Sequence, residues 1–372
     1  MRIKLRQAFD LQMGKTPARN RPDYWNGDHK WISIADIGNA GKFLTKTKES
    51  ITEAGIDGSG IKVVPQGTVI MSFKLSIGKT AITSEDMYTN EAIMAFIDNG
   101  KFAVDTDYLY HLCCGTNWTA GTNKAVMGLT LNKATLLEKE IPLPNINEQH
   151  EIATKLDKID AIIAERQQQL ELIDQAVKSR FIELFGNFVY EHGRWSICEI
   201  GDVADTIDPQ PSHRTPPVSS DGVPYIGIAE CNYKTLQIDF ANARKVGRDV
   251  LQEHLNRYTL NKGDFIIGKI GTIGKPFFLP AEQTYTLSAN TVLIKPNKQK
   301  VEPQFLFAVF QSEYMERIID AEKKSTSQPA FGIQKVRKID IPMPPLELQE
   351  QFAAFVEQTD KSKLCGKMEV AA

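Results

Sequence analysis

The feature that most limits how this chain can fold is an internal repeat of about 200 residues. The motif Ile-Pro-x-Pro at 141–144, followed by Gln149, recurs 200 positions later at 341–344, followed by Gln349. Upstream, the segment 67–79 matches 263–275 at both glycines and the lysine, and 31–36 resembles 225–230. Three blocks in the same order at a nearly constant offset disfavour chance among common residue types. A duplicated unit fixes the architecture first, so we expect two copies of one fold.

Each copy has the pattern of a mixed domain in which strands dominate. Short β-favouring runs at 68–71 and 265–267 lie between glycines and prolines and predict strands. Helical patches occur near the end of each copy, around 131–140 and 305–319. The expected fold class is therefore α+β. It comprises two tandem strand-rich domains separated by long antiparallel, coiled-coil-like helices, with approximate internal two-fold symmetry.

The periodicity changes after each Ile-Pro-x-Pro motif, which we expect to end a domain and start a helix. From Ile152 the apolar residues alternate in steps of four and three, apart from Arg166 and Arg180 at two seam positions. This heptad pattern predicts one helix over 148–185, about 57 Å long at 1.5 Å per residue, ended by Gly186.

The helix after the second motif is short. Thr359 and Lys363 stand where its seam needs apolar residues, and the chain ends at Ala372. The expected division is a first domain at 1–144, a connecting helix at 145–187, a second domain at 188–344 and a C-terminal helix at 345–372. The latter can cover only the C-terminal half of the connecting helix. The uncovered residues are therefore predicted to dock another subunit: Ile152, Leu156, Ile159 and Ile163.

Composition excludes several classes of protein. No apolar stretch approaches the roughly 18 residues of a membrane span, and charges fill the N-terminus where a secretory signal would be apolar, so a cytoplasmic location is expected. The net charge of −2 disfavours indiscriminate coating of DNA.

The five cysteines form no metal-binding pattern. A redox pair is one interpretation of adjacent Cys113 and Cys114, but neighbours on a strand face opposite ways, so structural thiols are favoured.

The order and duplication of these motifs resemble the specificity subunit of type I restriction-modification enzymes. The opening Leu-Gln-Met-Gly-Lys-Thr-Pro at 11–17, the strand at 31–34 and the block at 67–79 are similar to its target-recognition domains. The resemblance covers nearly the whole chain and departs from the family in the short final helix. It implies a subunit without catalysis that binds double-stranded DNA, two methyltransferase subunits and, in the full complex, two motor-nuclease subunits. It also implies that the cofactors, S-adenosylmethionine and ATP with magnesium, belong to those partners.

Candidate DNA contacts are loop residues with the hydrogen-bonding groups that read base edges. In the first domain they are Lys15, Thr16, Arg19, Arg21, Lys74, Lys79, Asn117, Thr122, Asn123 and Lys124. In the second they are Ser212, His213, Arg214, Lys269, Thr272, Lys275, Lys323, Lys324, Ser325, Ser327 and Gln328. For each, a phosphate contact or a solvated side chain is an equally good interpretation, and about a third should touch DNA. Because Lys79 and Lys275 occupy the same place in both copies, they suggest a phosphate contact; a turn lysine is the alternative.

Two copies that differ at most positions predict an asymmetric, bipartite target. Two other functions remain open. One is a coiled-coil scaffold whose α+β domains bind protein, and the other is a nuclease. No carboxylates occur at an identifiable catalytic spacing, which disfavours the nuclease. A phosphate-binding loop ending in Gly78-Lys79-Thr80 is excluded, because Phe73 occupies the position of its first glycine.

Overall fold

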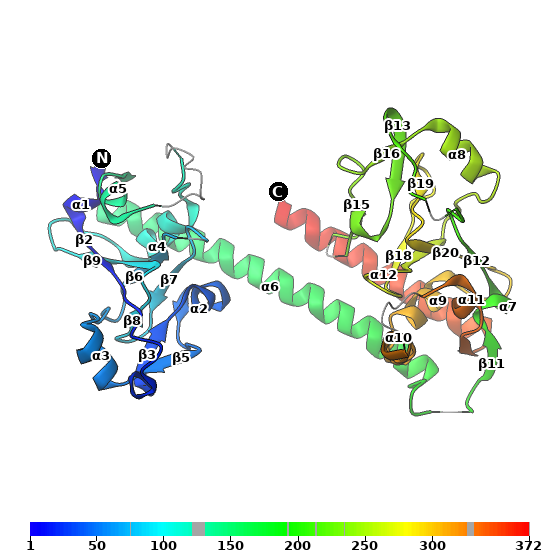
Figure 1. Cartoon of the computed structure of the whole chain (residues 1–372), viewed down its shortest axis with the longest axis horizontal. Helices are drawn as coiled ribbons and strands as arrows, with labels where there is room; N and C mark the ends of the chain where they lie inside the picture. The colour runs from blue at the N-terminus through cyan, green and yellow to red at the C-terminus, as the bar shows by residue number, and fades with distance from the viewer. Residues whose placement is uncertain are drawn as a thin grey trace. The chain divides into compact units, whose positions relative to one another are not determined.

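The computed structural model describes residues 1–74, 76–120, 131–191, 193–212, 214–233, 235–325 and 331–371. The chain forms two compact units, unit 1 (Met1–Ala164) and unit 2 (Glu165–Ala372). Figure 1 shows helix α6 (Ile146–Phe185), a single helix of 40 residues that begins in unit 1 and ends in unit 2. The four-part division made from the sequence remains a prediction.

Unit 1 is built on a five-stranded sheet in the order β2-β9-β6-β7-β4: Phe9–Met13, Ile93–Asp98, Val69–Ser72, Thr80–Thr83 and Phe43–Leu44. A second sheet has the order β5-β3-β8: Glu49–Ile51, Trp25–Ile32 and Tyr88–Thr89. The first and last strands, β1 (Arg2–Lys4) and β10 (Glu140–Pro142), pair with each other. The helices before α6 are α1 (Leu5–Ala8), the 3-10 helix η1 (Pro22–Tyr24), α2 (Ile34–Asn39), α3 (Glu53–Ser59), α4 (Thr106–Gly115) and α5 (Lys133–Leu137).

Both faces of the five-stranded sheet are covered, which explains its uninterrupted apolar runs. Successive side chains on a strand point to opposite faces. Val69 and Met71 accordingly pack with α4, whereas Ile70 packs with Ile32 and Leu44 on the other side. A strand buried on both faces does not show the alternation of a half-exposed strand.

Unit 2 repeats this plan with a four-stranded sheet in the order β12-β20-β17-β18: Ala204–Ile207, Thr291–Pro296, Phe265–Gly268 and Pro276–Phe278. The other strands are β16-β13-β19 (Lys245–Val246, Val218–Ile226, Thr286–Leu287), β14-β15 (Cys231–Asn232, Gln237–Ile238) and β11-β21 (Ser196–Glu199, Asp340–Met343). Its helices are α7 (Ile200–Val203), η2 (Ile228–Glu230), α8 (Arg248–Leu255), α9 (Pro303–Phe310), α10 (Glu313–Ser325), α11 (Ile333–Arg337) and α12 (Leu346–Ala371).

Strand register confirms that the units are two copies of one fold. Ile70 pairs with Ala95 and its counterpart Ile266 pairs with Leu293, antiparallel in both cases. The pairings β3–β8 and β13–β19 are both parallel. The copies diverge beside the sheet, where unit 1 adds β4 and unit 2 forms the β14–β15 hairpin. The expected fold class, tandem α+β domains with a long helix, is confirmed.

The repeated Ile-Pro-x-Pro and glutamine residues have a structural role. The isoleucine and first proline form β10 or β21, which closes its unit by pairing with that unit's first strand. The fully buried Gln149 amide donates to the carbonyls of Ala103 (3.0 Å) and Pro144 (2.9 Å) and accepts from the Asp105 N–H (2.9 Å). Gln349 likewise donates to the Pro344 carbonyl (2.8 Å) and accepts from the Glu302 N–H (2.9 Å). The glutamine therefore ties the start of each long helix to its domain.

Within unit 2, α12 runs antiparallel to the C-terminal part of α6. Phe352, near the start of α12, packs 5.6 Å from both Phe181 and Phe185, near the end of α6. Further along, the Lys363 ammonium lies 2.6 Å from the Asp174 carboxylate, so a polar seam position is filled by an ion pair. Helix α6 begins at Ile146, two residues before the predicted start, and Gly186 ends it with φ +80°.

Two local predictions were wrong. The strand expected at 31–34 ends at Ile32, because Ser33 begins the next helix and its N–H donates to the Asp36 carboxylate (2.7 Å). Cys113 and Cys114 lie on helix α4, not on a strand; Cys113 is buried and Cys114 is exposed. Burial raises the pKa of both thiols, which opposes thiolate chemistry.

Candidate nucleic-acid interface

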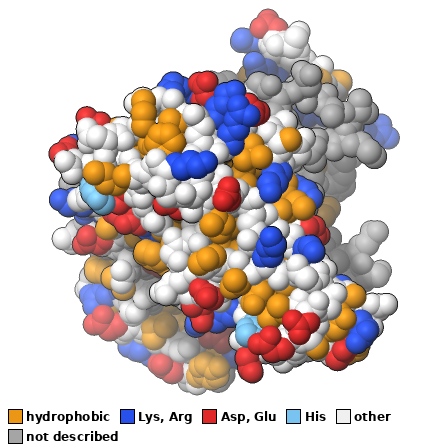
Figure 2. All heavy atoms as spheres, turned by 90° about the vertical axis from the view of Figure 1, so that its left-hand side faces the viewer, with side chains coloured by type: hydrophobic (Ala, Val, Ile, Leu, Met, Phe, Trp, Pro, Cys, Tyr) orange, Lys and Arg blue, Asp and Glu red, His pale blue; other side chains and the backbone are white. Residues whose placement is uncertain are grey.

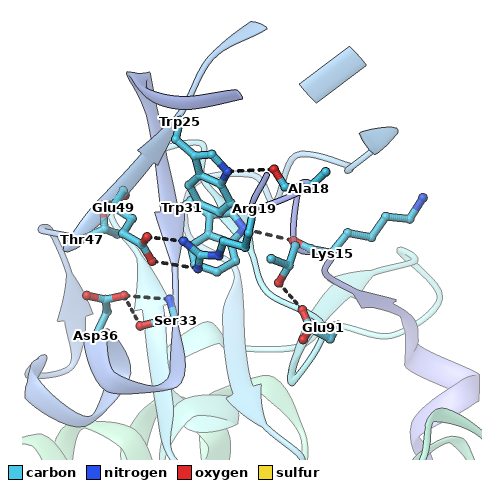
Figure 3. Close-up of polar contacts among 11 residues, drawn as sticks. Lys15, Ala18, Arg19, Trp25, Trp31, Ser33, Asp36, Thr47, Glu49 and Glu91 are labelled. Carbon is cyan, nitrogen blue, oxygen red and sulfur yellow. Dashed lines mark hydrogen bonds and ion pairs between the residues drawn. The ribbon is translucent and has the colours of Figure 1, made fainter. Parts of the chain in front are cut away.

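The first loop of unit 1, residues 14–21 between β2 and η1, is held at its backbone by two tryptophans. The Trp31 indole N–H donates to the Lys15 carbonyl (3.0 Å), and the Trp25 indole N–H donates to the Ala18 carbonyl (3.2 Å). The Lys15 N–H donates to the Thr89 carbonyl (2.9 Å). In Figure 3 the Lys15 side chain extends away from this cluster, and its ammonium donates to the Ser59 carbonyl (3.1 Å). The loop is therefore fixed while its lysine remains exposed.

The two arginines of this loop are engaged by carboxylates. The Arg19 guanidinium lies 3.9 Å from the Trp25 ring centroid and binds both carboxylate oxygens of Glu49 (Figure 3). These hydrogen bonds raise the pKa of Arg19 and lower that of Glu49. Arg21 makes a similar two-bond pair with Asp23, at 2.9 and 2.7 Å. Each carboxylate engages two of the five guanidinium N–H groups, which orients the arginine and leaves three donors for another partner.

The second loop of unit 1 joins β6 to β7 and is described at residues 73, 74 and 76–79; a backbone hydrogen bond joins its two ends. The Gly78 N–H donates to the Ser72 carbonyl (2.9 Å), with Gly78 at φ +92°. Glu91 interacts with both loops. It accepts a hydrogen bond from the Thr16 hydroxyl of the first loop and is attracted electrostatically to the Lys74 ammonium of the second. The Thr16 bond lowers the pKa of Glu91, which keeps this bridging carboxylate charged.

The remaining predicted residues of unit 1 are Asn117, Thr122, Asn123 and Lys124, and Asn117 lies beside the second loop. The Asn117 side-chain carbonyl accepts from the Thr119 N–H (3.2 Å) and hydroxyl (2.9 Å). The neighbouring Trp118 ring would be 3.6 Å from a Cβ at Gly78, which places 117–118 against the second loop. Thr122, Asn123 and Lys124 lie outside the described residues.

The first loop of unit 2, residues 208–214 after β12, has a buried root and an exposed tip. Pro209 and Gln210 are buried, whereas Ser212 and Arg214 are exposed. At the root, the Lys269 ammonium lies 3.1 Å from the Asp208 carboxylate. Each of these side chains is only 13% exposed. This ion pair joins the first loop to the second and gives Lys269 a structural partner. His213 lies outside the described residues.

The second loop of unit 2, residues 269–275, has the same closure as its counterpart. The Gly274 N–H donates to the Gly268 carbonyl (2.9 Å), with Gly274 at φ +72°. Thr272 and Ile270 are exposed. The shared lysine follows the closing glycine in both copies, and its side chain packs on a residue of the same unit. The Lys79 ammonium covers Gly38 on α2, and the Lys275 ammonium lies 4.0 Å from the Tyr233 ring.

Two of the remaining predicted residues of unit 2, Lys323 and Lys324, lie at the end of α10. Ile319 of this helix packs on Gly274, which brings the helix against the second loop. Lys323 is exposed and lies 3.1 Å from Asp320, and Lys324 is also exposed. A groove of about 850 Å³ is lined by the second loop, α10 and the paired helices. The Ser325 side chain, Ser327 and Gln328 lie outside what the structure describes.

Each unit therefore brings its predicted loops together, and none of these placements tests whether they touch DNA. The carboxylates that hold these loops, Glu49, Glu91 and Asp208, were not among the predicted site residues. They are paired with residues far away in sequence. Figure 2 shows basic and acidic side chains interspersed on the face it presents. Long-range attraction to phosphates is accordingly weak on that face.

The N-terminal part of α6 packs on unit 1 through one side. Asp157 accepts hydrogen bonds from the Lys42 ammonium (2.6 Å) and the His111 ring (2.8 Å). The heptad seam carries exposed isoleucines, Ile152 (38%), Ile159 (50%) and Ile163 (37%), with Leu156 partly buried. Ile162 (54%) is also exposed but lies outside this seam.

Among the described residues, no three His, Cys, Asp or Glu side chains gather as a metal site. In the same part of the chain, no helix is both long and apolar enough to cross a membrane.

The fold and the paired loops define a class of protein with two related recognition domains joined by a long helix. The profile of the type I restriction modification DNA specificity domain matches residues 1–173 and again 193–366. The chain therefore belongs to this family, which confirms the resemblance found in the sequence.

Individual relatives agree. The MjaIX specificity subunit of Methanocaldococcus jannaschii is 29% identical over 189 residues, covering 50% of this chain and 42% of the relative. The MjaVIII specificity subunit of the same organism is 24% identical, covering 93% and 83%. The crystal structure of a type I system S subunit from M. genitalium matches the fold with a TM-score of 0.56 at 14% identity, covering 100% of this chain and 92% of that one.

Proposed function

We propose that this chain is the DNA specificity subunit of a type I restriction-modification system, in which each unit reads one half of an asymmetric, bipartite target. The observation that carries the proposal is that equivalent loops share their backbone closure and differ in their side chains. Phe73 and Lys74 of unit 1 correspond to Lys269 and Ile270 of unit 2, while the following lysine is shared. A shared backbone closure with different side chains suits two domains that read different sequences.

The test uses the chain assembled with its methyltransferase subunits. The complex should retard one bipartite DNA sequence at a salt concentration that releases random DNA, because phosphate contacts weaken with salt and base contacts discriminate. Mapping the methylated positions would identify the target. A complex that binds all sequences alike would support the scaffold alternative instead.

The second part of the proposal is that the exposed side of α6 binds a methyltransferase subunit. Two such subunits and, in the full complex, two motor-nuclease subunits would perform the chemistry with S-adenosylmethionine and with ATP and magnesium. The cytoplasmic location expected from the sequence is part of the same proposal. Ile159→Asp and Ile163→Asp should prevent co-purification of the methyltransferase subunit. The matched control is Ile162→Asp, which alters an exposed isoleucine outside the heptad seam. Assembly unchanged by both seam substitutions, or lost equally in the control, would rule this docking site out.

A further inference from the structure

The exposed tip of the first loop in unit 2 is connected to its buried root by hydrogen bonds. The Gln210 amide nitrogen donates to the Ser212 hydroxyl (2.9 Å), and that hydroxyl accepts from the Arg214 N–H (3.4 Å). Prolines on both sides of Gln210 restrict the backbone there. Gln210 is therefore the inner end of a short chain that leads to two predicted DNA contacts.

Gln210 is in turn held by His254, the penultimate residue of α8. This histidine is only 1% exposed, and its ring bonds at both nitrogens, Nε2 to the Gln210 carbonyl oxygen and Nδ1 to the Thr286 hydroxyl. A carbonyl oxygen can only accept, so Nε2 carries the proton and Nδ1 accepts from Thr286. Burial lowers the pKa of His254 and so favours the neutral ring that this arrangement needs.

A tyrosine fixes the other side of the histidine. The Tyr258 hydroxyl accepts from the Leu287 N–H (3.2 Å) and lies 3.1 Å from the Thr286 hydroxyl and 3.2 Å from His254 Nδ1. The ring is thus anchored to β19 on one side and holds Gln210 on the other. Buried, fully bonded networks of this kind specify one geometry.

Unit 1 holds its equivalent loop with unrelated groups. There the indoles of Trp25 and Trp31 hold the loop backbone. The strand position of Thr286 is occupied in unit 1 by Tyr88, because Tyr88 lies opposite Trp31 as Thr286 lies opposite Tyr225. The buried histidine network is therefore specific to unit 2 and is not part of the scaffold that the two units share.

We propose that His254 is a positioning residue for one half of the DNA target, placing Ser212 and Arg214 through Gln210 without touching DNA itself. This inference rests on the proposed function. It predicts that loss of His254 changes how well one half-site is discriminated and leaves the other half-site unaffected.

The experiment compares methylation rates of the assembled complex on its mapped target and on DNA with one base pair changed in either half. The ratio of two rates on the same preparation does not depend on the fraction of active protein. His254→Ala should reduce discrimination in one half-site about tenfold, the scale of one mismatched base pair, with the other half-site unchanged. Gln210→Ala should have the same effect, and the double variant should add nothing further.

Two variants separate positioning from general destabilisation. His254→Gln replaces the imidazole N–H with an amide N–H that can donate to Gln210, so discrimination should be restored at least in part. Tyr258→Phe removes a hydroxyl from the same network but leaves the His254–Gln210 bond, so it should lower stability with both ratios unchanged. If His254→Ala does not assemble, Gln210→Ala carries the same prediction. Unchanged ratios, or an equal loss in both half-sites, would overturn the role of His254. A wild-type complex without half-site preference would instead refute the proposed function.

Discussion

The repeated glutamine offers a test of the duplicated architecture with an internal comparison. Gln149→Ala leaves three main-chain groups without their partner: the carbonyls of Ala103 and Pro144 and the N–H of Asp105. Gln349→Ala leaves two, the carbonyl of Pro344 and the N–H of Glu302. At about 1 kcal/mol for each buried group left unpaired, the expected losses are about 3 and about 2 kcal/mol.

Hydrogen–deuterium exchange in increasing urea, read peptide by peptide, would measure the two units separately. Gln149→Ala should lower the unfolding free energy of unit 1 and Gln349→Ala that of unit 2, each without effect on the other unit. Gln351→Ala, an exposed glutamine on α12, is the control and should change stability by less than about 0.5 kcal/mol. Buried variants that behave like this control would refute the role assigned to the glutamine.

Three further outcomes are expected. Phe352→Ala should destabilise unit 2 by about 3–5 kcal/mol in urea unfolding, since it empties a fully buried site, and Phe355→Ala on the same helix should cost clearly less. Because burial lowers the pKa of His254, the unfolded state takes up its proton first. Unit 2 should therefore lose stability as the pH falls below 6.5, and a urea midpoint that is flat with pH would contradict this. Glu49→Gln should lower the unfolding free energy of unit 1 by only about 0.5 kcal/mol, because the Arg19–Glu49 pair is half exposed. It should nevertheless increase the quenching of Trp25 fluorescence by an added small-molecule quencher, because Arg19 would no longer be held over the ring. Unchanged quenching would show that Arg19 stays on Trp25 without the carboxylate.

Much of the architecture could be predicted because duplication and helical periodicity are local or self-referential signals. The heptad pattern gave α6 to within two residues at its start and correctly at Gly186. The error at 31–34 arose because Ser33 and Asp36 form a helix start. The Ser33 N–H and hydroxyl both donate to the Asp36 carboxylate, which outweighs the β propensity of the flanking isoleucines.

The loops could be named from the sequence, but what holds them could not. Arg19 and Glu49 are 30 positions apart, and Lys269 and Asp208 are 61 apart. No local pattern marks such pairs. Arg19 could therefore be named as a candidate DNA contact, but its pairing with Glu49 could not be foreseen. The repeated glutamine was recognised only as a marker of the repeat, and its bonds to Ala103 and Pro144 required the folded chain.

The closing strands have a consequence for how such chains can change. In each unit the segment that enters is hydrogen-bonded to the segment that leaves, Arg2 opposite Pro142 and Ser196 opposite Met343. The first and last strands of each unit are therefore adjacent, so the chain enters and leaves the unit at the same place. Recombination at these two points would move a whole unit into another chain without dividing its hydrophobic core. New combinations of half-targets could then arise from gene exchange alone, with no need to evolve a new fold.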